Sequence, residues 1–600
     1  MSVEAESEGV ERKSTALFPW WVIALFILCF AAQFFIQTQV VQFKTEYDHD
    51  RNLMIAKGLS ETGILSFLGK AYVGNPPLYY AIHAIPMALF GFNYVVVKLL
   101  ELLLFFGGAV IAYLITLKVF ESRKAAVLAF LLSGGLTWTA IYASAVRFYS
   151  VVFFFASLLI YAYVLFLEKQ SWKRSLFLGS VFGLCMLTKD SFAFVGFAIC
   201  LHFALHVLLA AKGNEQRLRL LKFGIIAAFA AIIVYSPWIF YLNANGLQFP
   251  WDFHKMEASG DLPWGNRTDL GPFYNVFVLM FQNWPVMTFS IFLFLFFSIK
   301  AGGSFKNSFR QEPLIWVLIV VAISTPLVHK LILKLVDLHQ AFFVFAPLPI
   351  LASGLVFGKK TPLKSRYLRL VVLTALILSA AIMSAVKVQQ LTMPMSDFMS
   401  EDSWKFMDSL TPADAVAVEC YSTMNVFTKA YAEYFPHARP EPVFFILNGV
   451  DYYMHSGLPA KEDIPDYIER VTTFYKPFGW CGTPVVVFSV NKTLIAESLG
   501  LECAGRLKLE GPDGRPARQA QVTVANPDAG WSIPYVSGND GMVEVYVPKG
   551  SSGNFVFYVK AIGFKEQSGT VGIPESCNDT MQVSLSPTSK FFHGFNESRY

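Results

Sequence analysis

The sequence predicts a multi-pass α-helical membrane protein with a globular, external carboxyl-terminal third, and three observations lead to this fold class. Hydrophobic residues make up 54% of the chain and charged residues only 15%, whereas soluble domains average about 45–50% and about 25%. Mean hydropathy is +0.47, and the apolar residues gather between residues 19 and 389 in blocks of roughly the 20 residues that a bilayer core requires. Residues 390–600 have the mixed composition of globular protein.

The membrane part is predicted to contain about 11 transmembrane helices within residues 18–389. Each corresponds to an apolar window, and the windows are 18–38, 94–117, 125–143, 149–167, 175–188, 191–211, 223–242, 274–299, 313–333, 338–357 and 370–388. The first window shows no small-x-small cleavage site, so we interpret it as a retained helix that follows a cytoplasmic segment 1–17.

The distribution of Lys and Arg predicts the orientation. With the amino terminus inside, the predicted cytoplasmic segments carry about twice as many Lys and Arg as the opposite side, as the positive-inside rule requires. These basic segments lie at 12–13, 118–124, 169–174, 212–222, 300–310 and 359–369. An odd number of helices then places residues 390–600 outside.

Cysteines and glycosylation sequons agree with an external tail. Four of the seven cysteines stand in it, where an oxidising compartment permits disulfides; they are Cys420, Cys481, Cys503 and Cys577. Four cysteines allow three pairings, and sequence does not choose among them. All Asn-x-Ser/Thr sequons fall on the predicted outside, at Asn266, Asn491, Asn578 and Asn596.

Two predicted external loops, 39–93 and 243–273, are too long to be simple connections. The first holds Asp48 and Asp50, a D-x-D pair that could bind a divalent metal such as Mg²⁺ or Mn²⁺, or supply a general base with an electrostatic partner. A bare D-x-D is more often a solvated turn or a helix cap. Its position between a membrane helix and an amphipathic segment favours a functional interpretation.

Cations are predicted at the same face of the membrane. Arg147 and Lys189 precede helices, while Lys330, Lys334 and His339 flank an external turn. Ionisable residues near hydrocarbon are costly and are therefore candidates for function, although Lys330 and Lys334 could simply extend to the interface. Cations beside two carboxylates suit a substrate with an anionic headgroup and an apolar tail, which fits a lipid-phosphate enzyme and an anion transporter equally well.

Seven short motifs follow one another in a recognisable order. The first two are the runs Asp48–Ala56 and Pro76–Tyr80, similar to D-E-x-R-Y-x-x-x-A and P-P-L-x-Y. The others are Gly91–Leu99, Ser144–Tyr149, Leu187–Lys189, Pro237-Trp238 with Gly246 and Phe249, and Lys334 with His339 and Pro347. This series resembles the GT-C superfamily of polyprenyl-phosphate-sugar-dependent glycosyltransferases, in the branch of the protein O-mannosyltransferases and the lipid A aminoarabinose transferases. His49 replaces the usual second acidic residue, and Asn75 stands where several relatives have Lys.

The resemblance implies inverting transfer of a sugar from a polyprenyl phosphate to an acceptor outside the cytoplasm. It implies that Asp48 is the base and that Asp50 assists it or binds metal. It also implies donor-phosphate contacts from Arg147, Lys189, His339 and Lys334. The substrate loop around them would comprise Arg51, Pro76, Pro77 and Tyr79.

The external tail is predicted to have two parts without catalytic motifs. Residues 390–505 resemble a mixed α/β domain, with strands near 415–418 and 484–488 and helices near 400–410 and 463–475. Residues 506–600 contain short alternating strands bounded by Gly, Pro and Asp. They resemble a carboxypeptidase regulatory-like β-sandwich followed by a terminal tail.

The alternative to a glycosyltransferase is a transporter or flippase of a lipid-phosphate or anionic substrate, and a silent receptor is a third possibility. A transporter should show internal repeats, and none is evident. No basic-aromatic stripe suggests nucleic-acid binding. We expect membrane lipids and a polyprenyl-phosphate sugar as partners, and the plasma membrane of a prokaryote rather than the endoplasmic reticulum. The sugar, the acceptor and the carrier are not determined by the sequence.

Overall fold

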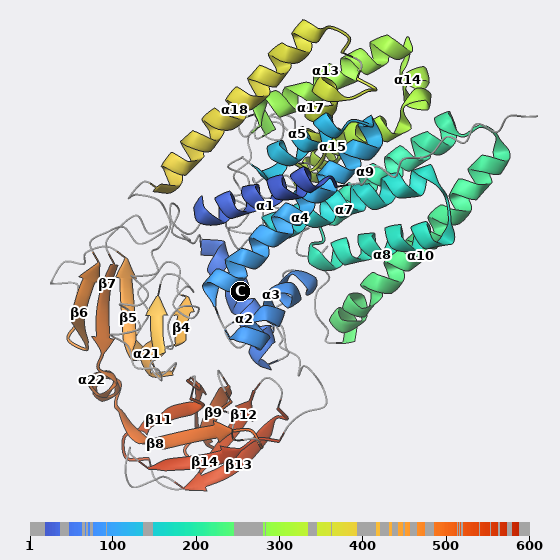
Figure 1. The fold of residues 1–600 in the computed structure, drawn as a ribbon. Helices are drawn as coiled ribbons and strands as arrows, with labels where there is room; N and C mark the ends of the chain where they lie inside the picture. Colours follow the sequence, from blue (N-terminus) through green and yellow to red (C-terminus); the bar gives the residue numbers. More distant parts are fainter. Residues whose placement is uncertain are drawn as a thin grey trace, which may run out of the picture.

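The structure, a computed structural model, consists of a bundle of α-helices joined to two regions of β-sheet (Figure 1). It describes residues 18–36, 47–62, 66–67, 70–71, 76–91, 93–135, 148–244, 280–281, 284–333, 345–361, 363–392, 416–419, 431–434, 442–447, 450–456, 465–474, 485–512, 514, 516–517, 520–538, 540–551, 554–561, 564–572 and 579–586.

The helix bundle confirms a multi-pass membrane fold but not the predicted number of spans. Each of the eleven apolar windows contains a helix, and these are α1 (Trp20–Phe35), α4 (Tyr94–Phe120), α5 (Arg123–Phe130), α7 (Tyr149–Glu168), α8 (Trp172–Thr188), α9 (Phe192–Leu205), α10 (Asn214–Ala244), α13 (Pro285–Gly302), α15 (Pro313–Leu333), α17 (Pro347–Phe357) and α18 (Arg366–Thr392). Within the described ranges, six helices are long and apolar enough to cross a membrane. A seventh span results if α15 is counted together with α14 (Phe305–Gln311), which meets it at a bend of 117°.

The difference from eleven arises because several windows contain short helices. Helix α1 has 16 residues and α17 has 11, less than the roughly 20 that a straight span needs. Helix α5 has eight residues and continues into the π-helix η2 (Leu131–Gly135). Helix α9 likewise continues into η3 (His206–Ala210).

Side-chain caps explain where several of these helices begin. The Asn93 Oδ1 atom accepts hydrogen bonds from the backbone N–H groups of Val95 and Val96 at 3.0 and 3.3 Å, at the start of α4. Ser122, Ser171 and Ser304 cap α5, α8 and α14 in the same way. Such caps satisfy N–H groups that have no partner inside the helix.

Helices α8 and α10 pack unusually closely because α8 has glycines at the contact. A Cβ atom added at Gly179 would lie 2.0 Å from the Ala227 carbonyl oxygen, and one added at Gly183 would lie 2.6 Å from the Val234 Cβ atom. Small residues four apart allow helix backbones to approach in this way inside membranes. The contact matters for function because α8 ends at Lys189, one of the predicted site residues.

We expect Gly179→Ala to destabilise the protein by about 1–3 kcal/mol, the usual cost of overpacking a tight contact. The added methyl group would collide with backbone, which cannot rotate away as a side chain can. The measurement is the thermal unfolding midpoint of the purified chain in detergent. Ser180→Ala, at the neighbouring half-buried position, is the control and should leave the midpoint unchanged. Equal midpoints for both variants would contradict the proposed tight contact.

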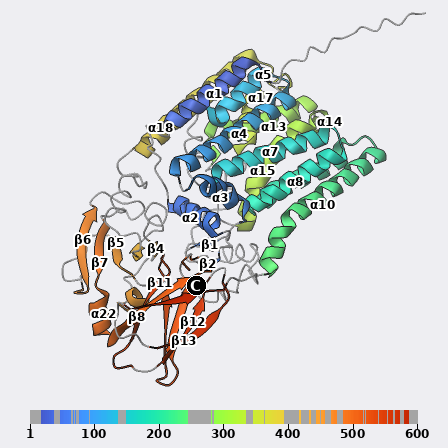
Figure 2. The ribbon, with the colours of Figure 1, turned by 60° about the horizontal axis from the view of Figure 1, so that its bottom comes forward.

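The first predicted external loop is largely structured. It contains α2 (Tyr47–Thr62), the two-stranded pair β1 (Ser66–Phe67) and β2 (Lys70–Ala71), and α3 (Leu78–Phe90). Both views place α2 and α3 at the end of the bundle that faces the sheets (Figures 1 and 2). Helix α3 buries Tyr79, Tyr80 and His83 and leaves Leu89 and Phe90 71% exposed. The second predicted loop lies outside the described residues beyond Ala244.

The first β region is a five-stranded mixed sheet with the strand order β4-β3-β5-β7-β6. Its strands are β3 (Val416–Glu419), β4 (Tyr431–Tyr434), β5 (Tyr452–Ser456), β6 (Ile468–Phe474) and β7 (Val485–Val490), with the short helices α21 (Pro442–Leu447) and α22 (Lys492–Ser498) beside them. Strands β3 and β7 lie where the sequence predicts strands. The helix predicted near 463–475 is wrong, because residues 468–474 pair antiparallel with β7. The helix predicted near 400–410 lies outside the described residues.

The second β region consists of two sheets that share one apolar core. One sheet has the order β10-β9-β12-β13 and the other the order β11-β8-β14. The strands are β8 (Leu501–Glu510), β9 (Gln521–Asn526), β10 (Trp531–Val536), β11 (Met542–Pro548), β12 (Asn554–Lys560), β13 (Gln567–Gly572) and β14 (Thr580–Ser584). Alternating residues of both sheets, such as Leu507 and Val524, are buried in this core, as in a β-sandwich. The resemblance to carboxypeptidase regulatory-like domains stays a prediction.

One disulfide is identified in the tail. Cys503 on β8 is disulfide-bonded, whereas Cys29, Cys185 and Cys200 of the membrane part are free. Since the chain has seven cysteines, the partner of Cys503 is one of Cys420, Cys481 and Cys577, all of which lie outside the described residues.

A cluster of charged side chains joins the two β regions. The Lys492 Nζ atom, at the start of α22, lies 2.9 Å from Asp451 Oδ1 and 2.6 Å from Glu544 Oε2 on β11. The Arg506 Nη2 atom on β8 lies 3.0 Å from Glu544 Oε1. Burial lowers the pKa of Lys492, but Asp451 and Glu544 outweigh burial and raise this pKa to about 12. Burial raises the pKa of Glu544, but Lys492 and Arg506 together hold it below its ordinary value.

This cluster predicts a pH-dependent stability of the tail. The lowered pKa of Glu544 means that its contribution is complete above the ordinary value of 4.5 and is lost as the pH falls further. The raised pKa of Lys492 means that its contribution is complete below 10.5 and is lost as the pH rises through about 12. Between these limits we expect Glu544→Gln to cost roughly 1–3 kcal/mol, between the values of exposed and buried pairs.

The measurement is thermal unfolding of the full chain in detergent between pH 3 and pH 8. The difference between wild type and Glu544→Gln should shrink below about pH 4.5, where the wild-type carboxylate gains its proton. Glu566→Gln is the control, because its pairing with Lys560 involves a side chain that is 60% exposed. A difference that does not change with pH would contradict the role of the Glu544 charge.

Candidate active site

Two of the predicted catalytic residues lie at the start of α2. Asp48, Asp50 and Arg51 fall within the first five residues of this helix, and their side chains lie outside the described part of the structure. Helix α2 faces α3, which carries the Pro76–Tyr80 motif. The two motifs of the first loop are therefore on neighbouring helices. Three of the predicted phosphate contacts, Arg147, Lys334 and His339, lie outside the described residues.

The Pro76–Tyr80 motif forms the beginning of α3 and turns its tyrosines inward. Pro76 is buried and Pro77 caps the helix with φ −76°, a value that the proline ring favours at a helix start. Tyr79 and Tyr80 are both 0% exposed. The predicted substrate loop therefore contributes a buried aromatic pair, with ring centroids 5.3 Å apart.

Tyr79 is held by a polar cluster between α3 and α4. Its hydroxyl donates to the Glu101 Oε1 atom at 3.3 Å. The His83 Nε2 atom lies 2.7 Å from the same oxygen, and His83 Nδ1 lies 2.8 Å from the Tyr79 carbonyl oxygen. Lys98, one turn before Glu101 on α4, is only 3% exposed. This cluster buries four polar side chains at the point where α3 meets the long apolar helix α4.

Phe148 connects Tyr79 to Lys189. The Phe148 and Tyr79 ring centroids are 4.0 Å apart, and the Lys189 Nζ atom lies 4.6 Å from the Phe148 centroid. Phe148 belongs to the Ser144–Tyr149 motif and Lys189 to the Leu187–Lys189 motif. Three motifs that are far apart in the sequence thus meet at one wall, formed by Tyr79, Phe148 and the partly exposed Lys189. Attraction between a cation and an aromatic face holds the ammonium there.

Asp190 and Tyr235 complete this side of the site. Asp190 follows Lys189 in the turn between α8 and α9 and is 7% exposed. Its Oδ1 atom accepts a hydrogen bond of 3.0 Å from the Tyr235 hydroxyl on α10. Tyr235 lies just before the Pro237-Trp238 motif, which falls inside α10 rather than at its end. The hydrogen bond between Asp190 and Tyr235 therefore joins the neighbourhoods of the Leu187–Lys189 and Pro237-Trp238 motifs.

Sequence reasoning missed the residues that support the predicted ones. His83, Glu101, Asp190 and Tyr235 were not among the predicted site residues, although a carboxylate at position 101 inside an apolar window is a usual signal of function. Asp190 could have been noted beside Lys189. Nothing in the local sequence marks His83 or Tyr235, because their partners are 18 and 45 residues away.

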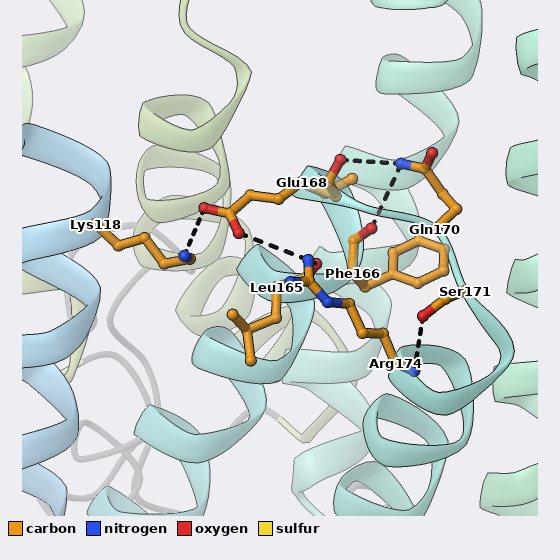
Figure 3. Close-up of polar contacts among 8 residues, drawn as sticks. Lys118, Leu165, Phe166, Glu168, Gln170, Ser171 and Arg174 are labelled. Atoms are coloured by element: carbon orange, nitrogen blue, oxygen red, sulfur yellow. Dashed lines mark hydrogen bonds and ion pairs between the residues drawn. The ribbon is translucent and has the colours of Figure 1, made fainter. Parts of the chain in front are cut away.

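A different ionic cluster lies at the other end of α8 (Figure 3). The Lys118 Nζ atom lies 2.9 Å from Glu168 Oε1, and the Arg174 Nη1 atom lies 3.6 Å from Glu168 Oε2. Arg174 also donates to the Leu165 carbonyl oxygen, so the ends of α4, α7 and α8 are tied together. Because α8 has 17 residues, this cluster is about 25 Å from Lys189 at 1.5 Å per residue. It belongs to the face that the sequence predicts to be cytoplasmic.

The comparisons identify the fold. Residues 74–241, which include Tyr79, Phe148, Lys189 and Tyr235, match the family model of the dolichyl-phosphate-mannose-protein mannosyltransferases. The structure is similar to that of ArnT from Cupriavidus metallidurans in the apo state, with a TM-score of 0.55 and 14% identity over 79% of this chain and 98% of that one. The chain therefore has the GT-C glycosyltransferase fold that its motifs predict.

A second structure of the same relative shows it with a lipid. ArnT from Cupriavidus metallidurans bound to undecaprenyl phosphate matches with a TM-score of 0.54 and 13% identity, over 78% of this chain and 98% of that one. No curated protein sequence matches the chain.

Proposed function

We propose that the protein is a membrane glycosyltransferase that moves a sugar from a polyprenyl-phosphate donor to an acceptor on the extracytoplasmic side. The observation that carries this proposal is the wall formed by Tyr79, Phe148 and Lys189, where three separate motifs meet beside the helix that bears Asp48. A partly exposed ammonium over an aromatic ring suits the phosphate and the first isoprene units of such a donor. The relative ArnT, which shares the fold, has been seen with undecaprenyl phosphate.

The proposed reaction is a single inverting displacement. Asp48 takes the proton of the acceptor hydroxyl while the acceptor oxygen forms a bond to the anomeric carbon. The bond between that carbon and the phosphate oxygen breaks with its electron pair, and polyprenyl phosphate leaves. Lys189, together with Arg147, stabilises the negative charge that develops on the leaving phosphate. His339 and Lys334 are proposed as further phosphate contacts, and Arg51, Pro76 and Pro77 as parts of the substrate loop.

The extracytoplasmic side is proposed from two independent features. The basic loops place the amino terminus in the cytoplasm. The disulfide at Cys503 supports an oxidising environment for the tail. Both agree with the plasma membrane of a prokaryote as the proposed location.

A divalent metal held jointly by Asp48 and Asp50 is a separate hypothesis. Both positions are on α2. The role proposed for Asp48, as a base, requires no metal. We therefore expect EDTA to leave sugar transfer within about twofold of the untreated rate. Restoration of a lost activity by Mg²⁺ or Mn²⁺ would instead establish the metal site.

The experiment that tests the function is sugar transfer in purified membranes with a panel of radiolabelled polyprenyl-phosphate sugars. The expected result is movement of label to an acceptor with release of polyprenyl phosphate. Membranes that lack the protein are the control. Folded protein that transfers no label from any donor, but moves a donor across the bilayer, would establish the transporter instead.

A further inference from the structure

His83 and Glu101 form a fully buried pair of ionisable side chains that the proposed reaction does not use. They are 1% and 0% exposed, and their Nε2 and Oε1 atoms are 2.7 Å apart. His83 lies on the external helix α3 and Glu101 on the membrane helix α4. The pair is therefore the polar link between the substrate loop and the bundle.

The hydrogen bonds orient the His83 ring. Its Nδ1 atom lies 2.8 Å from the Tyr79 carbonyl oxygen, and a carbonyl oxygen can only accept, so Nδ1 is the donor. Its Nε2 atom lies 2.7 Å from Glu101 Oε1, which also accepts from the Tyr79 hydroxyl.

This hydrogen-bonded pair holds Tyr79 at two points. The Glu101 carboxyl group binds the Tyr79 hydroxyl directly, and His83 binds the Tyr79 backbone carbonyl. The Tyr79 ring in turn packs against Phe148, whose ring carries the Lys189 ammonium. A change at Glu101 therefore reaches Lys189 through two ring contacts.

Stability alone does not explain such a pair. Burying two ionisable side chains is costly, so an apolar pair of similar volume would stabilise the contact at least as well. Within the described part of the chain, the Glu101 Oε2 atom has no hydrogen-bond partner. A buried carboxylate oxygen left in this way is costly and is characteristic of functional sites.

We infer that His83 and Glu101 are positioning residues. They fix the Tyr79 and Phe148 rings, and these rings hold the Lys189 ammonium in place to bind the phosphate of a lipid carrier. This inference rests on the proposed function and adds to it the residues that set donor affinity. Neither side chain needs to touch the donor.

The test measures binding of undecaprenyl phosphate to the purified full-length chain in detergent. We expect Glu101→Gln and His83→Gln each to weaken binding about tenfold, and the double variant to weaken it little further, because either change breaks the same pair. Glu168→Gln is the control: it also removes a carboxyl group that contacts basic side chains, but at the end of α7, near the start of α8. Undecaprenol, which lacks the phosphate, should bind the wild type and all four variants alike.

A spectroscopic measurement distinguishes positioning from a merely structural contact. In ¹⁵N-histidine spectra of the wild type, one signal should be that of a ring hydrogen-bonded through both nitrogens, and it should be absent from His83→Gln. In Glu101→Gln this signal should shift, because Nε2 loses its carboxyl partner.

Two results would overturn the inference: unchanged phosphate affinity in both variants, or a His83 signal that is the same in the wild type and in Glu101→Gln. A failure of the proposed function would give a different result. The wild-type protein would then not bind undecaprenyl phosphate, while the spectrum would still report the hydrogen bonds of His83.

Discussion

Asp48→Asn is expected to lower sugar transfer by between about 10² and 10⁴ fold, the range of a lost general base. The amide has nearly the same size as the carboxylate but cannot take the proton of the acceptor hydroxyl. The affinity for undecaprenyl phosphate should stay within about twofold, because Asp48 is proposed to act on the acceptor and not on the carrier. The measurement compares transfer rates and lipid binding in the same preparation.

The neighbouring carboxylate supplies the control for this prediction. Asp50→Asn makes the same chemical change two residues along α2. We expect an effect at least tenfold smaller. If instead Asp50→Asn abolished transfer and Asp48→Asn did not, the base would be assigned to Asp50, and the match of Asp48 to the family motif would be misleading.

Lys189→Met is expected to lower the donor kcat/KM by about 10² to 10³ fold, as the loss of one preorganised charge at a leaving group does. Methionine preserves much of the length and apolar stem of lysine, so its packing on Phe148 should survive. The lost interaction grows as charge develops on the phosphate, and kcat should therefore fall more than KM rises. Initial rates over a range of donor concentrations separate the two effects.

Lys173→Met is the matched control for Lys189→Met. The Lys173 Nζ atom also lies over an aromatic ring, 5.6 Å from the centroid of Trp172. It stands at the opposite end of α8, on the predicted cytoplasmic face, and should leave transfer unchanged. Similar losses in both variants would indicate a general effect of removing a lysine from α8 and would argue against a phosphate contact at Lys189.

The membrane part illustrates what local sequence determines. Apolar length predicts a helix in each of the eleven windows, because apolar segments of this kind satisfy their backbone groups internally and bury their side chains. Local chemistry also explains individual helix starts, such as the cap that Asn93 provides for α4. Length alone did not predict how many of these helices span. The bend of 117° between α14 and α15 and the 11-residue length of α17 are given only by the structure.

The carboxyl-terminal tail also shows that a local sequence pattern does not determine every element. Residues 468–474 have a pattern compatible with a helix, yet they form β6. Pairing with β7, from Ile468 with Val490 to Phe474 with Val485, decides the conformation. Strand pairing between distant residues supplies backbone hydrogen bonds that no local pattern reveals.

The sequence by itself determined the fold class, the order of the motifs and the prediction of Asp48, Tyr79 and Lys189 as site residues. These depend only on composition and on short runs of residues. Only the tertiary structure brought Tyr79, Phe148 and Lys189 to one wall and placed the His83–Glu101 pair behind it. The physical reason is that periodicity reports which residues leave water, whereas the identity of each buried partner depends on how separate helices pack.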